Sequence, residues 1–252
     1  MLRLAALLAC MAALPAMAEE VVLGLSRDKV AITTNFDGSE ILVFGAVKRE
    51  SPIADGTLDV IVAISGPSEA IDVRRKERRF GIWINVESVV VDAAPSYYTV
   101  ATTRPFSEVL TSVEDLRHRV SIPRAIRSVG APSTVKDAQA YTDAVIRIRK
   151  ASGAYSVQEG AVTLDEQTLF STSITLPANL TEGDYATRIL LTRGGRVVSE
   201  FETVIDVRKV GLERWLYSLS RQQPFWYGIM SLAIAIAAGW GASAAFQFLR
   251  RG

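Results

Sequence analysis

The sequence contains one cysteine and one histidine, and both scarcities limit what the protein can do. Cys10 lies in an apolar N-terminal segment, so a chain that loses this segment has no cysteine and forms no disulfide. With His118 as the sole histidine, a metal site built from histidine and cysteine is strongly disfavoured. A Ser-His-Asp triad has one candidate base and no G-x-S-x-G nucleophile motif, and we expect His118 to be a solvated side chain on a helix surface.

Phosphate-binding glycine loops and a charge of one sign are also missing. No Walker-type or dinucleotide-type motif occurs, so we predict no cofactor. One of the 28 basic residues, Arg3, lies in the N-terminal segment, and the remaining basic residues equal the 27 acidic ones in number. A chain with equal numbers of basic and acidic residues lacks the overall positive charge that binds nucleic acid. Any electrostatic recognition must therefore depend on local clusters of charge. These absences favour a protein that is not an enzyme, although catalysis by carboxylates alone stays open.

The N-terminal segment 1–18 has the pattern of an export signal. A basic residue precedes an apolar run from Leu4 to Leu14, and Ala16-Met17-Ala18 forms an A-x-A cleavage pattern. The run is too short to span a bilayer, so we predict cleavage before Glu19. The alternative is a bacterial lipobox that would lipidate Cys10, although the apolar stretch before it is short for a signal core.

A second apolar segment lies near the C-terminus. Residues 225–249 carry no charge and, at about 1.5 Å per residue, form a helix long enough to cross a hydrocarbon core of about 30 Å. We predict one transmembrane helix at 224–249, with Trp226 and Tyr227 at an interface. Because a cleaved signal exports the bulk of the chain, we expect a single-pass protein of the bacterial inner membrane with a periplasmic domain and a cytoplasmic tail at 250–252.

Small residues recur at every fourth position along this apolar segment. They form two rows, Ala233, Ala237, Gly241 and Ala245, and Ala235, Gly239 and Ser243. Such rows let helix backbones approach closely, which predicts self-association or docking on another integral-membrane protein. An ordinary alanine-rich span is the alternative.

The segment before the span, 209–223, predicts a short amphipathic helix. Its apolar residues fall at helical spacing, and its charged residues occupy the remaining positions. A helix with this pattern lies on the outer membrane surface or serves as a plain linker.

The exported domain, 19–208, carries strand signals on both sides of its middle. In residues 58–64 and 197–207 side chains follow a period of two, as in strands. Gly194-Gly195 separates the runs TRILLTR and RVVSEFETVIDV and predicts a two-residue hairpin turn between them. Before that hairpin, LPANLTEGDY places turn residues ahead of a tyrosine that enters the penultimate strand, as at a sandwich corner. The pattern predicts a mainly-β fold, an immunoglobulin-like β-sandwich.

Residues 105–153 interrupt the strand pattern. Apolar residues from Phe106 to Val120 follow helical spacing, and those from Ala138 to Ile148 do so again. Thr134 and Asp137 form a plausible capping box for the second helix. We therefore predict a helical insertion, or a helical layer packed on the sandwich.

The stretch RRKERRFGIWIN combines five basic residues with a strand pattern. Apolar residues occupy odd positions before the basic run and even positions after it. Because a strand changes phase only at a bulge or a turn, we expect a chain reversal or kink here, with the long side chains in water. The residues after the run predict a half-buried core strand in which Trp83 faces away from Ile82 and Ile84.

Two interpretations of the basic run stay open. The first is a solvated turn that protects a sheet edge from aggregation. The second is a site for a lipid headgroup, an acidic partner or a small oxyanion, with Trp83 either packed under the helical insertion or exposed as a contact. The candidate anion-binding or partner-binding residues are Arg74, Arg75, Lys76, Arg78, Arg79 and Trp83.

The order of these features resembles a known family. An export signal, VRRKERRFGIWIN, YYTVATTRP, a sandwich-like end and one C-terminal span occur together in the transmembrane protein family of alphaproteobacteria, and RRKER followed by GIW is the most distinctive part. The resemblance covers the chain from Glu19 to its end. It implies a bacterial, membrane-anchored protein and supplies no catalytic residues.

These observations favour a membrane-anchored periplasmic interaction or accessory module, for an inner-membrane transporter or an envelope complex. The alternative is a periplasmic sensor that binds an anion or another ligand through the basic run. A hydrolase or transferase is the third hypothesis, and it requires a pair of carboxylates in a pocket.

Overall fold

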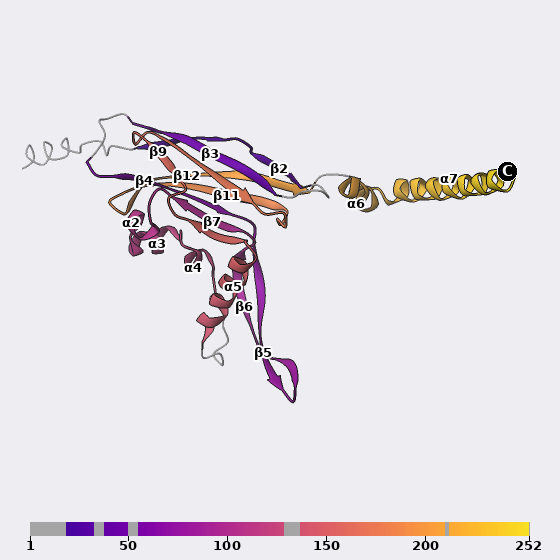
Figure 1. Ribbon diagram of the computed structural model, residues 1–252, viewed down its shortest axis with the longest axis horizontal. Coiled ribbons are helices and arrows are strands. Elements are labelled where there is room, and N and C mark those ends of the chain that lie inside the picture. Colours follow the sequence, from indigo (N-terminus) through magenta and orange to yellow (C-terminus); the bar gives the residue numbers. More distant parts are fainter. Residues whose placement is uncertain (1–18, 33–37, 50–54, 129–136, 210–211, 252) are drawn as a thin grey trace, which may run out of the picture. The chain divides into compact units, whose positions relative to one another are not determined.

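The computed structural model describes residues 19–32, 38–49, 55–128, 137–209 and 212–251 (Figure 1). The predicted export signal 1–18, with Cys10, lies outside the described residues, and so does Thr134. The chain divides into two compact units, Met1–Val30 with Asp37–Val207 and Ala31–Phe36 with Arg208–Gly252.

Two sheets form the sandwich. The four-stranded sheet has the order β1-β3-β10-β9 and contains β1 (Glu20–Leu25), β3 (Ser39–Lys48), β9 (Thr163–Asp165) and β10 (Leu169–Leu176). The six-stranded sheet has the order β2-β12-β11-β4-β7-β8 and contains β2 (Lys29–Ile32), β4 (Leu58–Ser65), β7 (Tyr98–Thr102), β8 (Tyr155–Gln158), β11 (Gly183–Arg193) and β12 (Arg196–Lys209). Strands β7 and β8 pair in parallel, whereas β4, β11 and β12 pair antiparallel.

The strand order is that of an immunoglobulin domain. Such domains place strands A, B, E and D in one sheet and strands G, F and C in the other. When β1, β3, β4, β9, β10, β11 and β12 are named A to G in chain order, both sheets reproduce this arrangement. The predicted mainly-β, immunoglobulin-like fold with a helical insertion and one C-terminal apolar helix is therefore confirmed.

The penultimate strand begins at a tyrosine corner. Tyr185 is fully buried on β11, and its hydroxyl donates a hydrogen bond of 2.8 Å to the carbonyl of Thr181, four residues upstream. Its ring lies 6.2 Å from that of Tyr97, whose own hydroxyl donates to the carbonyl of Thr175 on β10 at 3.2 Å. The two tyrosines thus connect the two sheets in a domain whose strands contain no cysteine.

The two-residue turn between β11 and β12 is also confirmed. Arg193 pairs with Arg196, and the intervening Gly194 and Gly195 have φ of +59° and +75°. Two left-handed residues form a type I′ turn, whose twist matches that of the paired strands.

The helical insertion follows β7 and is more broken than the spacing predicts. The expected helix from Phe106 to Val120 is divided into α2 (Phe106–Val109) and α3 (Ser112–His118), and α4 (Ile122–Ala125) follows. The division has two causes: Thr111 accepts a hydrogen bond from the Glu114 amide and begins a new helix, and Arg119, with φ of +52°, ends it. Periodicity reports which side is buried, and a chain can keep one buried side through several short helices.

The second predicted helix is α5 (Ala138–Ala151). Its N-cap is Asp137, whose carboxylate accepts from the amide of Ala140 at 3.2 Å. The predicted capping box, which has Asp137 three residues inside the helix, is therefore wrong. Arg149 and Lys150 lie in the last turn, and Gly153, with φ of +74°, follows the C-cap. Cationic side chains in the last turn interact favourably with the helix dipole.

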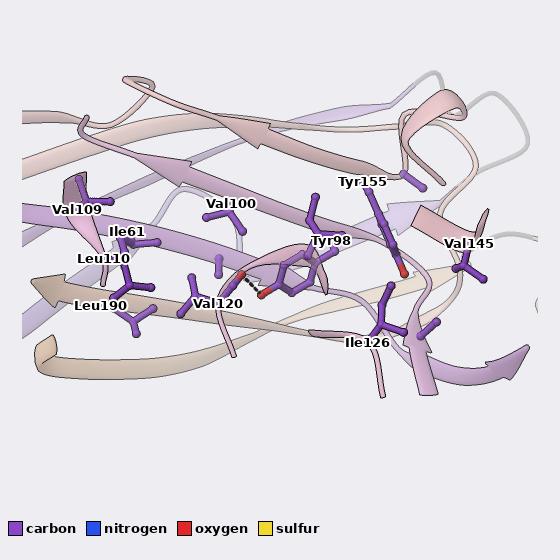
Figure 2. Close-up of a cluster of buried hydrophobic side chains, with 14 of the residues drawn as sticks. Ile61, Tyr98, Val100, Val109, Leu110, Val120, Ile126, Val145, Tyr155 and Leu190 are labelled. Atoms are coloured by element: carbon purple, nitrogen blue, oxygen red, sulfur yellow. Dashed lines mark hydrogen bonds between the residues drawn. The ribbon is translucent and has the colours of Figure 1, made fainter. Parts of the chain in front are cut away.

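The helices cover the outer face of the six-stranded sheet. The apolar layer between this sheet face and the helices is the second core of the domain, in addition to the layer between the two sheets. Figure 2 shows it: Ile61 and Leu190 of the sheet meet Val109, Leu110 and other apolar residues of the insertion. The buried Tyr98 donates a hydrogen bond of 2.8 Å to the carbonyl of Val120 and so attaches the insertion to β7. The inner-face residues Val60, Val62 and Ile64 are equally buried, which leaves β4 covered on both faces.

A long two-stranded hairpin leaves the sandwich between β4 and β7. Its strands, β5 (Ser68–Arg79) and β6 (Ile82–Pro95), form a sheet of their own. The part of the hairpin near the sandwich contributes to the second core, against which Ile71 and Val73 pack. Figure 1 shows the hairpin extending past the sheets, with α5 beside its inner part.

The second unit contains two helices. Helix α6 (Leu212–Gln222) lies within the range 209–223, and α7 (Pro224–Arg251) contains the segment Pro224–Ser243, which is long and apolar enough to cross a membrane. No described part of the chain covers the side chains of this segment.

We predict that Tyr185→Phe lowers the free energy of unfolding by about 1 kcal/mol, because the Thr181 carbonyl loses its donor at a partly buried position. Urea unfolding of the detergent-solubilised chain measures the change. Tyr217→Phe removes an exposed phenol on α6 and is the matched control, with an expected change of less than about 0.5 kcal/mol. Equal stability of the two variants would contradict a structural role for the corner.

Candidate functional site

The basic run forms the outer part of β5. Arg79 pairs with Ile82, and Phe80 and Gly81 make the turn between them. The register also shifts between Arg75 and Lys76, so the change of phase in the sequence corresponds to a bulge and a turn. The expected chain reversal at the basic run is present.

Acidic neighbours pair with several of these cations. Arg74 lies 3.0 Å from Asp72, Arg75 lies 3.5 Å from both Glu77 and Glu87, and Arg79 lies 3.3 Å from Glu77. The arginine side chains in these pairs are more than half exposed, so each pair contributes little to stability. The guanidinium groups remain accessible to a partner.

The tip of the hairpin exposes three large apolar side chains. Phe80 is fully exposed, and Ile82 and Trp83 are 64% and 68% exposed. The prediction of a half-buried core strand is wrong for these residues, because no sheet or helix that the structure describes covers this end of the hairpin. Full burial on β6 begins at Val89. Of the two placements considered for Trp83, the structure has the exposed one.

The turn itself is an unfavourable place for phenylalanine. Phe80 has φ of +50° and Gly81 has φ of +86°. Glycine, asparagine and aspartate are preferred where both turn residues are left-handed, and a bulky residue there costs of order 1–3 kcal/mol. Phe80 therefore combines backbone strain with complete exposure of its ring to water.

Closer to the sandwich, the hairpin and α5 enclose a cleft of about 510 Å³. Three of the candidate residues line it, Arg74, Arg75 and Lys76, whereas Arg78, Arg79 and Trp83 do not. The other lining residues are Val73, Glu87, Asp137, Ala140, Tyr141, Ala144 and Arg147. The lining residues of α5 were not predicted from the sequence, although Ala140 and Ala144 at helical spacing are a signal that this face of α5 leaves room.

One contact holds the two walls of the cleft together. The hydroxyl of Tyr141 on α5 donates a short hydrogen bond to Glu87 on β6. Because this bond favours the protonated phenol next to a carboxylate, it raises the pKa of Tyr141, and the charge of Glu87 acts in the same direction. The raised pKa keeps the phenol protonated, so the Tyr141 hydroxyl stays the donor of this contact, the clamp between Tyr141 and Glu87.

His118 is less solvated than the sequence predicts. Its Nδ1 lies 2.9 Å from Glu200 on β12, and its Nε2 lies 3.6 Å from Glu114 on the same helix. Within the ranges described above, no group of three or more histidine, cysteine or acidic side chains could hold a metal ion. His118 thus connects α3 to the sheet.

The rows of small residues lie on α7. Ala233, Ala235, Ala237, Gly239, Gly241 and Ser243 belong to the exposed part of the helix, and Ala245 falls where side chains are not described. Their role in helix packing stays a prediction.

Comparison with known proteins places the chain in a family. The model of the family described as "Putative transmembrane protein (Alph_Pro_TM)" matches residues 20–248. The chain belongs to the Alph_Pro_TM family. It is thus a membrane protein, and α7 is its candidate span.

Other comparisons add little about this Alph_Pro_TM protein. A search of curated proteins found no match. One solved structure, "Enterococcal surface protein, partial N-terminal region", is 11% identical and is covered over 44% of its length by 78% of this chain, with a TM-score of 0.27. The chain thus spans less than half of that structure, and the likeness is weak.

We predict that Trp83 behaves as a water-exposed indole. In a variant with Trp215, Trp226 and Trp240 replaced by phenylalanine, its emission should be that of an indole in water. Iodide should quench it more strongly than caesium, because the surrounding arginines attract the anion. Emission of a buried indole, insensitive to both ions, would contradict the exposed placement.

Proposed function

We propose that this Alph_Pro_TM protein is a non-catalytic interaction module that is anchored by α7 and offers its β5–β6 hairpin to a partner in the bacterial envelope. The observation that carries the proposal is the tip, where Phe80, Ile82 and Trp83 are exposed together beside Arg78 and Arg79. Tryptophan and arginine dominate the binding energy of protein interfaces, and aromatic residues are enriched there.

Folding stability does not account for the tip. A left-handed phenylalanine costs free energy, and three exposed apolar side chains at a sheet end favour aggregation. Asparagine or glycine would make the same turn without either cost. A partner that covers the tip accounts for both features.

The partner proposed is an integral-membrane protein or an envelope complex, for which the chain acts as an accessory subunit. The match to a transmembrane protein family and the apolar helix α7 support a membrane anchor for the domain. An anchor raises the effective concentration of any partner in the same membrane. The proposed orientation has the sandwich in the periplasm, α7 in the inner membrane and Arg250 and Arg251 in the cytoplasm, and it rests on the signal pattern of residues 1–18.

The acidic groups of the cleft support a non-catalytic role. Catalysis by carboxylates needs two such groups that are available to a substrate. Glu87 accepts from Tyr141 and pairs with Arg75, and Asp137 caps α5. Both therefore already have structural partners.

A specific observation favours a second candidate function. The cleft beside α5 gathers four cationic side chains around a small-molecule-sized space, which suits a sensor of anions. This candidate is independent of the tip, because the tip residues do not line the cleft.

To test the tip, Phe80 and Trp83 are both changed to serine, and crosslinking in native membranes is followed by mass spectrometry. Loss of one hot-spot residue costs about 2 kcal/mol, so we expect partner affinity to fall at least roughly thirtyfold. The matched control changes Val113 and Leu116 to serine, two exposed apolar residues of α3, and should leave capture unchanged. Undiminished capture by the tip variant would refute the proposal.

The membrane helix is tested separately. Gly241→Leu adds bulk in the middle of a small-residue row and should abolish crosslinked oligomers or complexes formed through α7. Gly228→Leu makes the same change outside both rows and should have no effect. If the two variants crosslink alike, the rows do not form a packing surface.

A further inference from the structure

The cleft between the hairpin and α5 has the dimensions of a ligand site. Its volume of about 510 Å³ falls within the range of about 300–1,000 Å³ typical of pockets for small molecules. It exists because Ala140 and Ala144 are small and lie one turn apart on the helix face that lines it. The clamp between Tyr141 and Glu87 fixes the distance between the two walls.

The charges of the cleft do not balance. Its cations are Arg74, Arg75, Lys76 and Arg147, and its anions are Glu87 and Asp137. Arg75 and Glu87 pair with each other, and Arg74 pairs with Asp72 outside the cleft. Within the described part of the chain, Lys76 and Arg147 make no ion pair or side-chain hydrogen bond. One of these two cations belongs to the hairpin and the other to the helix.

The lining also includes an apolar part. Val73, Ala140 and Ala144 supply aliphatic surface, and Tyr141 adds an aromatic side chain to the lining. Inorganic ions alone would leave this surface in contact with water. A ligand with an anionic group on an apolar body matches both the cationic and the aliphatic lining. Arginine holds carboxylates and phosphates in two-point contacts, and the apolar body covers the aliphatic residues.

We infer that this cleft binds a small organic anion, a carboxylate or phosphate on an apolar body, between Lys76 of the hairpin and Arg147 of α5. The inference rests on the anion-binding candidate above and not on the tip. The same chemistry is found in free organic acids or phosphate esters and in the headgroup region of anionic phospholipids. The experiment separates these two sources.

The test is calorimetric titration of the full-length chain in phosphatidylcholine nanodiscs with phenyl phosphate, benzoate and inorganic phosphate. We expect phenyl phosphate or benzoate to bind at least about tenfold more tightly than inorganic phosphate. A charged hydrogen bond is worth about 1.5–3 kcal/mol, so Lys76→Ala with Arg147→Ala should weaken binding by about tenfold or more. Ala144→Leu fills the cleft without changing its charge and should also weaken binding.

The matched control is Arg78→Ala with Arg79→Ala, which removes two cations of the same hairpin outside the cleft. It should leave the affinity within about twofold, since exposed charges beyond the cleft act weakly. The inference is overturned if neither organic probe binds, or if this control weakens binding as much as the cleft variant.

Nanodiscs that contain phosphatidylglycerol identify the source of the anion. A fall in the apparent affinity for phenyl phosphate, abolished by Lys76→Ala with Arg147→Ala, shows lipid headgroups competing for the cleft; unchanged affinity shows that it takes a free anion. Capture of a partner by the tip should persist in the Lys76 and Arg147 variant. A negative calorimetric result for the cleft therefore does not affect the proposal for the tip. A negative crosslinking result for the tip likewise does not affect the inference for the cleft.

Discussion

Burial of the outer face of the six-stranded sheet is the constraint on which the rest of the structure depends. Strand β4 carries apolar residues at both odd and even positions, and therefore on both faces of its sheet. The opposite sheet of the sandwich can cover one of these faces, and the other needs a second layer. Since the strands contain no cysteine, apolar burial must supply the stability that disulfides give many exported domains. The helices α2 to α5 supply that second cover, and Tyr98 attaches them at their middle. The position of these helices determines which part of the β5–β6 hairpin packs against them and which part is exposed to water.

Much of the sandwich is predictable because it follows from local rules. Alternation identifies β12, a Gly-Gly pair identifies the turn between β11 and β12, and turn residues before a tyrosine identify the corner at Tyr185. The phase change around the basic run likewise places a bulge and a turn, because side-chain direction in a strand admits no other solution.

The candidate site is less predictable because it depends on distant segments. The pattern around Trp83 is that of a strand with one covered face, but alternation does not say whether any layer is available to cover it. The cleft requires Arg74 to Lys76 to lie beside α5, which is encoded far along the chain. Single-sequence periodicity identifies the apolar side of α5, whereas the contact between Tyr141 and Glu87 is set by how the whole insertion packs.

The clamp between Tyr141 and Glu87 also explains how so long a hairpin keeps its form. An isolated two-stranded ribbon is marginally stable in water, and its stability rises when a helix packs on it. Here the inner half of the ribbon has that helix, with Ile71 and Val73 packed against the second core. Within the described residues, the outer half has cross-strand pairs and exposed ion pairs in place of such packing. Stability therefore decreases from the sandwich toward Phe80. A ribbon of this kind holds its base in place and leaves its tip free to adjust, and the proposed interaction module would need both properties.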